Sequence, residues 1–326
     1  FKVLAIEKAL SIQAHPNKKL AEKLHRERPD VYKGTPNHDA TFAYNSHLVR
    51  RRQPQKMAIA ITPFSGFCNF RPLSEISTFL SSVPEFNSLI PAQAASALSS
   101  SPSDPKSALR EVFGALMSAP SDQIQSALDQ LIKRYESGGA TPAESQVVDL
   151  AQTLAKQYPG DVGVFCIFLL NAVKLNPGEA MFLQADEPHA YITGDNVVRA
   201  GLTPKLRDVP TLVSMLTYNS GPADAQRMEP KPFKGESSDS DSYTTLYDPP
   251  IPEFSVLLTD VPAGKKASHR SLDGPSIFIA TSGSGSVSGQ EIKSEGEVWF
   301  VGAGQSLEFT AGSEGLVLYR AFVEVA

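Results

Sequence analysis

The amino-acid sequence predicts a mostly β protein with an α-helical insert. Short apolar runs and alternating stretches, which are typical of strands, lie on both sides of a central region. That central region instead carries amphipathic helical stripes and helix-capping residues. From Pro252 to Val325, short apolar segments alternate with Gly-rich turns, a pattern that is typical of a β-barrel or a β-sandwich.

We divide the chain into five parts on this basis. The expected parts are a first β region at 1–72, a helical domain at 73–160, a second β region at 161–217, a linker at 218–250 and a C-terminal β-barrel at 251–326. The linker is expected because this stretch is rich in Ser, Asp, Pro and Gly.

Composition and charge narrow the possible functions. The 326 residues are 41% hydrophobic and 20% charged, as in an ordinary globular protein, and the net charge of −5 disfavours general binding to nucleic acid or to a membrane surface. We find no apolar run of the roughly 18–20 residues that span a bilayer and no signal-peptide pattern. Cys68 and Cys166 lie far apart in apolar runs, so we expect reduced thiols in a cytoplasmic protein. Because the chain opens with Phe1 inside an apolar run and without Met, we also expect residues to precede it.

The first β region is expected to contain three strands and a short helix. The strands are expected at Phe1–Ile6, Ala9–Ala14 and Met57–Thr62, and Asn17 is the expected N-cap of the helix. Phe64–Pro72 is expected to be an apolar-aromatic link.

The polar stretch Gly34–Gln55 has no sustained period and carries Arg50-Arg51-Arg52. It is either a solvated loop or a patch that binds phosphate or nucleic acid.

The helical domain is predicted from apolar stripes at helical spacing and from helix caps. A helix is expected at Leu73–Leu80, a low-complexity stretch at Ala92–Pro105, and a capping box from Thr141 to Glu144. The expected later elements are strands at Val162–Leu170, Val173–Leu175, Ala180–Leu183 and Ala190–Ile192, a helix at Val209–Leu216, and strands at Phe254–Leu258, Ser276–Ala280, Gly285–Ser288, Val298–Val301, Leu307–Phe309 and Leu316–Val323.

Two stretches contain candidate site residues. In Ala9–Pro16, strand alternation places Ser11, Gln13 and His15 on one face. A Gln and a His spaced by two residues can bind one metal ion, or they can form the solvated side of a half-buried strand.

The second stretch contains His189, followed by Arg199 and Lys205. The two cations are spaced to hold an anion, and Gly201 between them would allow a close approach.

Three motifs together resemble the type I phosphomannose isomerase family, in its fungal form. They are Ser11-Ile12-Gln13-Ala14-His15-Pro16, Glu187-Pro188-His189-Ala190-Tyr191 and Arg199-Ala200-Gly201-Leu202-Thr203-Pro204-Lys205. The resemblance implies two cupin-type β-barrels, the first one incomplete here, with a helical domain between the halves of the first. It also implies interconversion of mannose 6-phosphate and fructose 6-phosphate with one zinc ion.

The resemblance also implies roles for individual residues. Gln13, His15 and His189 match zinc ligands, and Arg199 matches the catalytic arginine. The residues that match the substrate pocket are Lys2, Ser11, Tyr191 and Lys205.

The chain departs from the family pattern in three places. Lys56 stands where the family has a glutamate as fourth zinc ligand, so that ligand is expected to be missing, and 39–55 is expected to be an inserted loop. Gly194-Asp195-Asn196 replaces a longer acidic segment before Arg199, and the family's first strands would precede Phe1.

The implied reaction moves a proton between two sugar carbons through an enediol and supplies the synthesis of GDP-mannose and glycosylation precursors. The sequence does not name the base that moves this proton. The expected partner is a small sugar phosphate, with neither nucleic acid nor membrane, and the expected state is a monomer. The alternative that the sequence leaves open is a non-catalytic cupin that binds a sugar phosphate, because Lys56 is unfavourable at a metal site.

Overall fold

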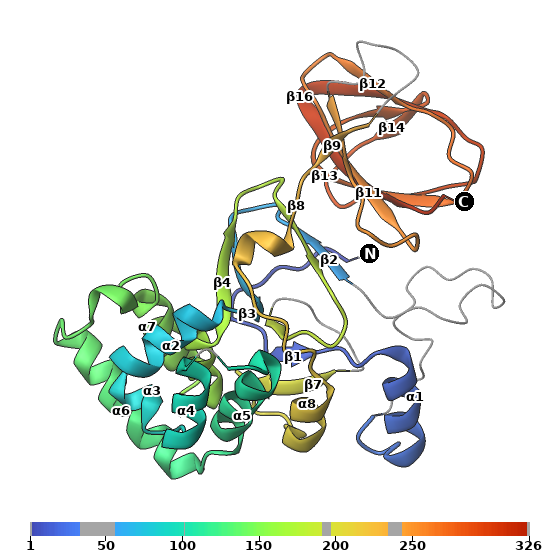
Figure 1. The fold of residues 1–326 in the computed structure, drawn as a ribbon. Helices are drawn as coiled ribbons and strands as arrows, with labels where there is room; N and C mark the ends of the chain where they lie inside the picture. The colour runs from blue at the N-terminus through green and yellow to red at the C-terminus, as the bar shows by residue number, and fades with distance from the viewer. Residues whose placement is uncertain (1, 33–55, 101, 191–196, 234–242, 325–326) are drawn as a thin grey trace.

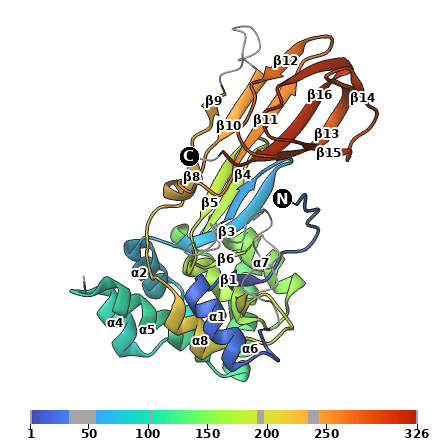
Figure 2. The same ribbon diagram turned by 90° about the vertical axis from the view of Figure 1, so that its right-hand side faces the viewer.

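The structure is a computed structural model that describes residues 2–32, 56–100, 102–190, 197–233 and 243–324. Figure 1 shows helices at one end of the molecule, a β region in the middle and a second β region at the other end, and the turned view in Figure 2 shows the same order. The predicted class, β structure with a helical insert, is confirmed. Within the described ranges, every helix is too short or too polar to cross a membrane. The expected inserted loop at 39–55 lies outside the described residues.

The middle β region contains two antiparallel sheets. The five-stranded sheet has the order β4-β3-β6-β1-β7, and the three-stranded sheet has the order β2-β5-β8. The strands are β1 (Ile12–Ala14), β2 (Lys56–Ile59), β3 (Phe64–Phe70), β4 (Leu170–Leu175), β5 (Ala180–Leu183), β6 (His189–Ala190), β7 (Val198–Gly201) and β8 (Arg227–Met228). Strands that precede and follow the helical segment are neighbours in both sheets, so both stretches of chain build this region. Closure of these sheets into a barrel stays a prediction.

The helices form because their apolar stripes pack into one core. They are α1 (Lys18–Glu27), α2 (Leu73–Ser82), α3 (Pro84–Asn87), α4 (Ala92–Ser99), α5 (Pro105–Ser118), α6 (Ser121–Glu136), α7 (Val148–Gln157) and α8 (Val209–Met215). The Asn17 side chain accepts a hydrogen bond from the backbone N–H of Leu20, as expected for an N-cap. Leu109 and Phe113 on α5 are fully buried, and each such side chain stabilises the fold by about 1.5–3 kcal/mol.

The predicted capping box is present, but the turn that it begins is a 3₁₀ helix, η1 (Pro142–Glu144). The Glu144 carboxylate accepts a hydrogen bond from the Thr141 backbone N–H at 2.6 Å. This carboxylate is fully buried, and Arg134 forms an ion pair with it at 2.6 Å. The capping box is therefore connected to α6 by the ion pair between Glu144 and Arg134.

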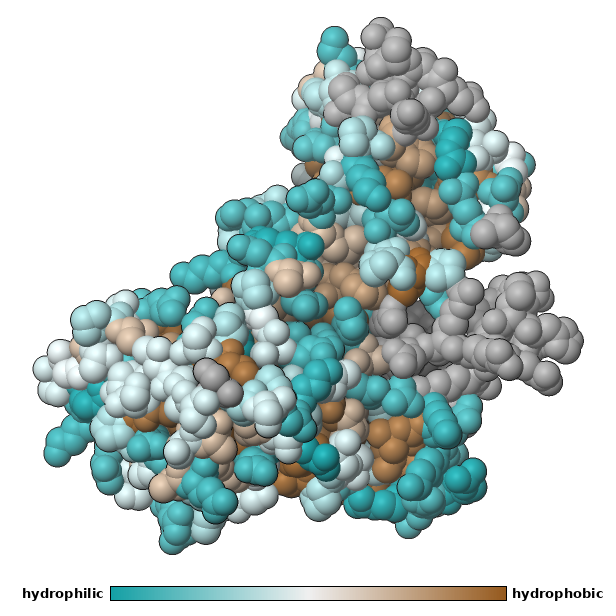
Figure 3. All heavy atoms as spheres, in the orientation of Figure 1, coloured by the Kyte–Doolittle hydropathy of each residue, from teal (hydrophilic) through white to brown (hydrophobic). Residues whose placement is uncertain are grey.

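The C-terminal β region has one main sheet, ordered β14-β13-β16-β11-β10-β9, with β12 paired to β16 and β15 paired to β13. Its strands are β9 (Lys231–Pro232), β10 (Thr244–Tyr247), β11 (Ser255–Val261), β12 (Lys266–His269), β13 (Ser276–Val287), β14 (Gln290–Ile292), β15 (Val298–Val301) and β16 (Leu307–Phe322). Tyr319 and Ala321 pack with Ala180 of β5 across the junction with the middle region. On the face drawn in Figure 3, hydrophobic residues gather around this junction.

Several local expectations are wrong. The run expected as a strand at Val162–Leu170 is instead a buried 3₁₀ helix, η2 (Val162–Phe168), because a continuous apolar run has no period that distinguishes strand from helix. The expected link at Phe64–Pro72 contains β3, and the described residues 2–6 form no strand.

The expected linker at 218–250 is also more structured than its composition suggests. It contains η3 (Ala223–Gln226), β8, β9 and β10. The C-terminal sheet therefore begins before residue 251, because β10 pairs with β11 along four residues.

Candidate functional site

Four strands of the five-stranded sheet bring four side chains into one row. Cys68 on β3 lies opposite His189 on β6, His189 lies opposite Gln13 on β1, and Gln13 lies opposite Arg199 on β7. Residues directly opposite in antiparallel strands point to the same face, with Cβ atoms about 4.5–5.5 Å apart. We call Cys68, His189, Gln13 and Arg199 the site row.

His15 joins the site row from the residue after β1. It lies two positions beyond Gln13, so strand alternation brings it to the same face. Its ring stacks on that of His189, with centroids 5.3 Å apart and an interplanar angle of 15°. Gln13 and His15 are 3% and 2% exposed, so the alternative of a solvated strand face is wrong.

His189 is held in one tautomer. Its Nδ1 lies 3.0 Å from the backbone carbonyl oxygen of Glu187, and a carbonyl only accepts, so the proton is on Nδ1 and the lone pair on Nε2. Burial, with the charge of Lys56 adding to the effect, lowers the pKa of His189 to about 4. The imidazole is therefore neutral at pH 7, which is the form that binds metal.

Lys56, the first residue of β2, faces the same interior. Alternation along β2 places it on the side of Ala58 and Ala60, which pack with Cys68. Its charge acts on the pKa of His189, so its ammonium group lies within electrostatic reach of that ring. A cation is thus directed toward the site row.

Arg199 forms the other end of the site row. It is partly exposed, and burial lowers its pKa from the usual arginine value. A guanidinium remains charged at neutral pH under such a shift, so it offers several N–H donors for an anion beside Gln13.

The remaining predicted site residues are Lys2, Ser11, Tyr191 and Lys205. Lys2 and Lys205 are exposed, Ser11 is partly exposed, and Tyr191 lies outside the described residues. Among the described residues, no hydrogen bond or ion pair connects the side chain of either lysine to the site row. The structure therefore brings together the proposed metal ligands and Arg199, but it does not extend this cluster to the predicted substrate contacts.

Gly201 allows a close approach of protein to protein, not of an anion as expected. A Cβ at this position would lie 2.5 Å from the Cα of Gly163 in η2. Asp161 fixes this crossing, because its carboxylate accepts hydrogen bonds from the backbone N–H groups of Leu202 and Thr203 at 2.7 and 3.0 Å. The role of Gly201 is thus structural, and the predicted role in anion binding is wrong.

Sequence reasoning missed Asp186, which connects the two histidine segments. Its φ is +59°, and its carboxylate accepts from both the backbone and the side chain of Asn17, at 2.9 and 2.8 Å. Its own backbone N–H donates to the carbonyl of His15 at 3.0 Å. Asp186 therefore fixes His15 relative to the loop before His189. The sequence signal that could have indicated this role is the acidic pair Asp186-Glu187 directly before Pro188-His189.

A metal site needs several donor side chains that can bind one ion. Within the described ranges, no three His, Cys, Asp or Glu side chains form a metal-binding group. Without a metal the Cys68 thiol keeps its proton at pH 7, because burial raises its pKa to about 12. Two imidazoles and the Gln13 carboxamide remain, and three protein ligands with one open position are typical of catalytic zinc sites. The donors fit zinc in type and number, and the charge of Lys56 opposes it.

Comparison with known proteins gives three matches to family models. They are the catalytic domain of type I phosphomannose isomerase over residues 1–73, its helical insertion domain over 84–170 and its C-terminal domain over 245–289. The chain belongs to the type I phosphomannose isomerase family. The resemblance drawn from the three motifs is confirmed, and with it membership of an enzyme family.

Similar proteins come from fungi, animals and bacteria. A mannose-6-phosphate isomerase of Cryptococcus neoformans is 47% identical, with 99% of this chain and 78% of that protein covered. A mannose-6-phosphate isomerase of Bos taurus is 41% identical, with 98% and 76% covered. Among solved structures, mannose 6-phosphate isomerase from Salmonella typhimurium bound to fructose 6-phosphate and zinc matches with a TM-score of 0.75 and 27% identity, over 99% of this chain and 78% of that one.

Proposed function

We propose that this chain interconverts mannose 6-phosphate and fructose 6-phosphate, with Gln13, His15 and His189 holding one zinc ion. The observation that carries the proposal is the stacking of two buried imidazoles at 5.3 Å, beside a carboxamide in register with one of them. The relatives' names and the zinc in the Salmonella structure support the same reaction and metal.

The reaction that we propose passes through an enediol. A zinc ion held by these three side chains would supply Lewis-acid polarisation of the sugar's carbonyl or hydroxyl oxygens. The backbone carbonyl of Glu187 orients the ring of His189 and keeps its proton on Nδ1, so Nε2 of this neutral imidazole would be the metal-binding atom. Arg199 then stabilises negative charge on the enediolate or on the phosphate.

The outer substrate contacts and the cellular setting are proposals as well. Ser11, Tyr191, Lys2 and Lys205 are proposed to line the path of the sugar phosphate. The two lysines are exposed, so they would contact the phosphate from the solvent side. We propose a monomer in the cytoplasm whose product supplies GDP-mannose synthesis.

Family membership does not favour the alternative of a non-catalytic cupin. The one observation on its side is Lys56, whose charge acts on His189 and opposes a divalent cation. We therefore propose a zinc affinity that Lys56 weakens, in a site that otherwise has the donors for the metal.

A coupled assay tests the proposal. Fructose 6-phosphate formed from mannose 6-phosphate is isomerised by one added enzyme. A second added enzyme then oxidises the resulting sugar phosphate and reduces NADP, which is measured. The chain is first stripped with a chelator and then assayed across a zinc titration, with bound zinc measured by mass spectrometry. We expect turnover that follows zinc occupancy. Absence of both turnover and bound zinc at saturating metal would refute the proposal.

A further inference from the structure

The C-terminal β region buries a set of polar side chains between two apolar clusters. We call this set the inner polar layer, and its members are Thr244, Thr259, His269, Ser276 and Arg320, all at most 3% exposed. The apolar residues around it include Phe278, Phe309 and Leu318 in one cluster and Leu257 and Phe322 in the other. The layer is separate from the site row, which lies in the middle β region.

Arg320 carries a charge with no acidic partner in the described part of the chain. Its Nε donates to Ser276 Oγ at 2.9 Å, and its Nη1 donates to His269 Nδ1 at 3.1 Å, so both partners are neutral. Burial lowers the pKa of Arg320 to about 10, with the charge of Arg270 adding to the effect, so it stays protonated at pH 7. A buried charge without a counter-charge is strongly unfavourable.

Hydrogen-bond donors outnumber acceptors in the inner polar layer. Because His269 Nδ1 accepts from Arg320, its Nε2 carries the proton and donates to Thr259 Oγ1 at 2.9 Å. Arg320 Nη2 is buried and has no hydrogen-bond partner among the described residues. A water molecule would bring two more protons, whereas an anion only accepts. The surplus of donors and the positive charge therefore favour an anion.

We propose that the inner polar layer binds a small monovalent anion of halide size at Nη2 of Arg320. The anion accepts from an N–H group of Nη2 and neutralises the guanidinium. The hydroxyl of Ser276 has its oxygen occupied by Nε and keeps its proton for the same anion. The apolar side chains on both sides of the layer limit the size of the occupant. This binding is independent of the isomerase reaction proposed above.

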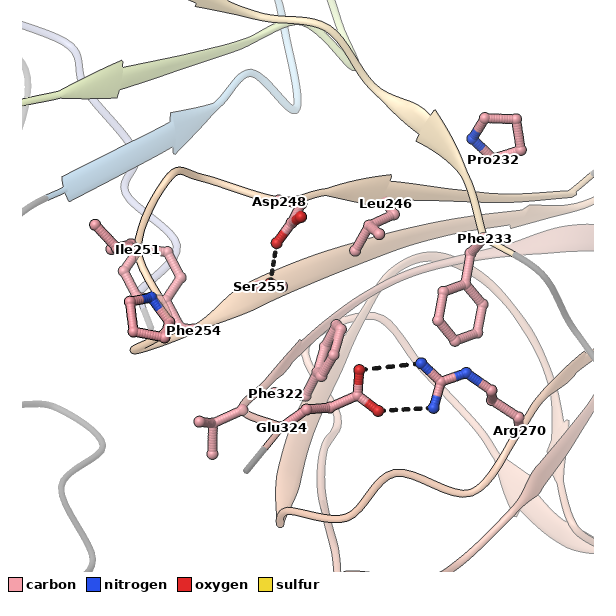
Figure 4. A pocket seen from close by; sticks show the side chains of 12 residues that line it. Pro232, Phe233, Leu246, Asp248, Ile251, Phe254, Ser255, Arg270, Phe322 and Glu324 are labelled. Atoms are coloured by element: carbon pink, nitrogen blue, oxygen red, sulfur yellow. Dashed lines mark hydrogen bonds and ion pairs between the residues drawn. The ribbon is translucent and has the colours of Figure 1, made fainter. Parts of the chain in front are cut away.

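A pocket lies next to the inner polar layer. Figure 4 shows this pocket of about 460 Å³, with Phe233 and Arg270 among its lining residues. The ring of Phe233 contacts that of His269 at 5.5 Å, so Phe233 separates the pocket from the layer. Arg270 is neutralised by Glu324 through hydrogen bonds of 2.7 and 3.0 Å, so the unneutralised charge lies behind the pocket and not in it.

Crystals of the full chain soaked in sodium bromide give the direct test. Bromide has an absorption edge that anomalous diffraction detects, so its position is measured without a variant. We expect an anomalous peak within hydrogen-bond distance of Arg320 Nη2. An ordered water there, or bromide confined to surface sites, overturns the proposal.

Thermal unfolding in solution gives the second test. We expect the melting temperature to rise saturably in sodium chloride or bromide relative to sodium gluconate at equal ionic strength, since gluconate is too large for the layer. R320M should lose this halide dependence, whereas the matched control R270M should retain it. If R320M does not fold, R320K, which keeps the charge with fewer donors, should need several-fold more halide for the same shift. Equal melting temperatures in all salts for the unchanged chain, or a halide effect that persists in R320M, contradict the proposal.

Discussion

The two β regions each bury a histidine, and the two histidines differ in what their nitrogens contact. His189 and His269 are 1% and 0% exposed, and burial lowers their pKa values to about 4 and about 3. The Nδ1 of His189 bonds a backbone carbonyl, which leaves the lone pair on Nε2. In His269 the Nδ1 lone pair accepts from Arg320, and Nε2 donates to Thr259. Burial and a low pKa are therefore common to the proposed metal ligand His189 and to His269, and the two histidines differ instead in the partners of their ring nitrogens.

The difference follows from how each residue is held. His189 belongs to a two-residue strand between β3 and β1, so its neighbours on both sides place Cys68 and Gln13 beside it. His269 ends β12, opposite Leu307 of β16, and its ring contacts that of Phe309 in the interior of the C-terminal β region. The central strand therefore presents His189 to the side chains of its two neighbouring strands, whereas His269 is enclosed in the interior of the C-terminal β region.

The largest expected effect separates the two histidines by function. H189A should lower kcat/KM by roughly 1000-fold or more, because it removes a ligand for Lewis-acid chemistry that is worth several kcal/mol. H269Q should leave both the rate and the zinc content near those of the unchanged chain. Turnover assays and zinc analysis of both variants measure this. Full zinc occupancy in H189A, or loss of zinc in H269Q, would break the comparison.

The second prediction concerns the pH dependence of stability. The folded-state pKa of His269 lies below its unfolded value of about 6.5, so the unfolded chain binds the proton first as the pH falls. The stability that neutral His269 provides is complete above pH 6.5 and is lost as the pH drops toward 3. Between pH 7 and pH 4.5 the loss is about 2–3 kcal/mol.

H269Q is the control for this prediction, because its amide can still donate to Thr259 and does not titrate. The free energy of unfolding, measured by urea denaturation at both pH values, should therefore fall less in H269Q than in the unchanged chain. Parallel pH profiles for the two proteins would show that His269 is protonated inside the fold.

The residue types of the candidate site could be predicted, but their register could not. Gln13, His15, His189 and Arg199 could be identified from three short motifs, because each motif is a continuous stretch of the sequence. Strand pairing joins residues that are far apart along the chain, so no local pattern says that Gln13 lies opposite both His189 and Arg199. The site row is therefore a product of topology.

The fold shows the same limit. The amphipathic stripe on α5 and the Asn17 cap could be predicted, because the spacing of apolar residues and the chemistry of a helix cap are local sequence signals. The run Val162–Phe168 is apolar throughout and is buried on all sides, so its sequence carries no period and its 3₁₀ form depends on the surrounding core. Asp161, which holds the crossing of η2 and β7, was missed because its partners are backbone N–H groups forty residues away.

The third prediction sharpens the role of Lys56. Replacing its ammonium group by a carboxylate removes a repulsive charge and adds an oxygen donor, so K56E should bind zinc at least about 10-fold more tightly. K56M removes the charge alone and should lie between the two. Competition against a zinc-binding dye measures the three affinities, apart from any assay of activity. Equal affinities in all three proteins would mean that the Lys56 side chain does not face the metal ligands.

The smallest expected effect concerns the support of the site row by Asp186. D186N tolerates the positive φ and keeps one acceptor oxygen, but it weakens the pair of hydrogen bonds from Asn17, at a cost of about 1 kcal/mol in the free energy of unfolding. D186N keeps the backbone N–H that donates to the carbonyl of His15, but the loop that carries this N–H is then held less firmly, so zinc affinity should fall a few-fold as well. D208N is the matched control, since Asp208 accepts from Tyr32 and Thr211 away from the site row. D208N should lower stability by a similar amount and leave zinc affinity unchanged. An equal loss of zinc affinity in both variants would show that zinc affinity depends on the stability of the whole fold and not on the spacing of His15 and His189.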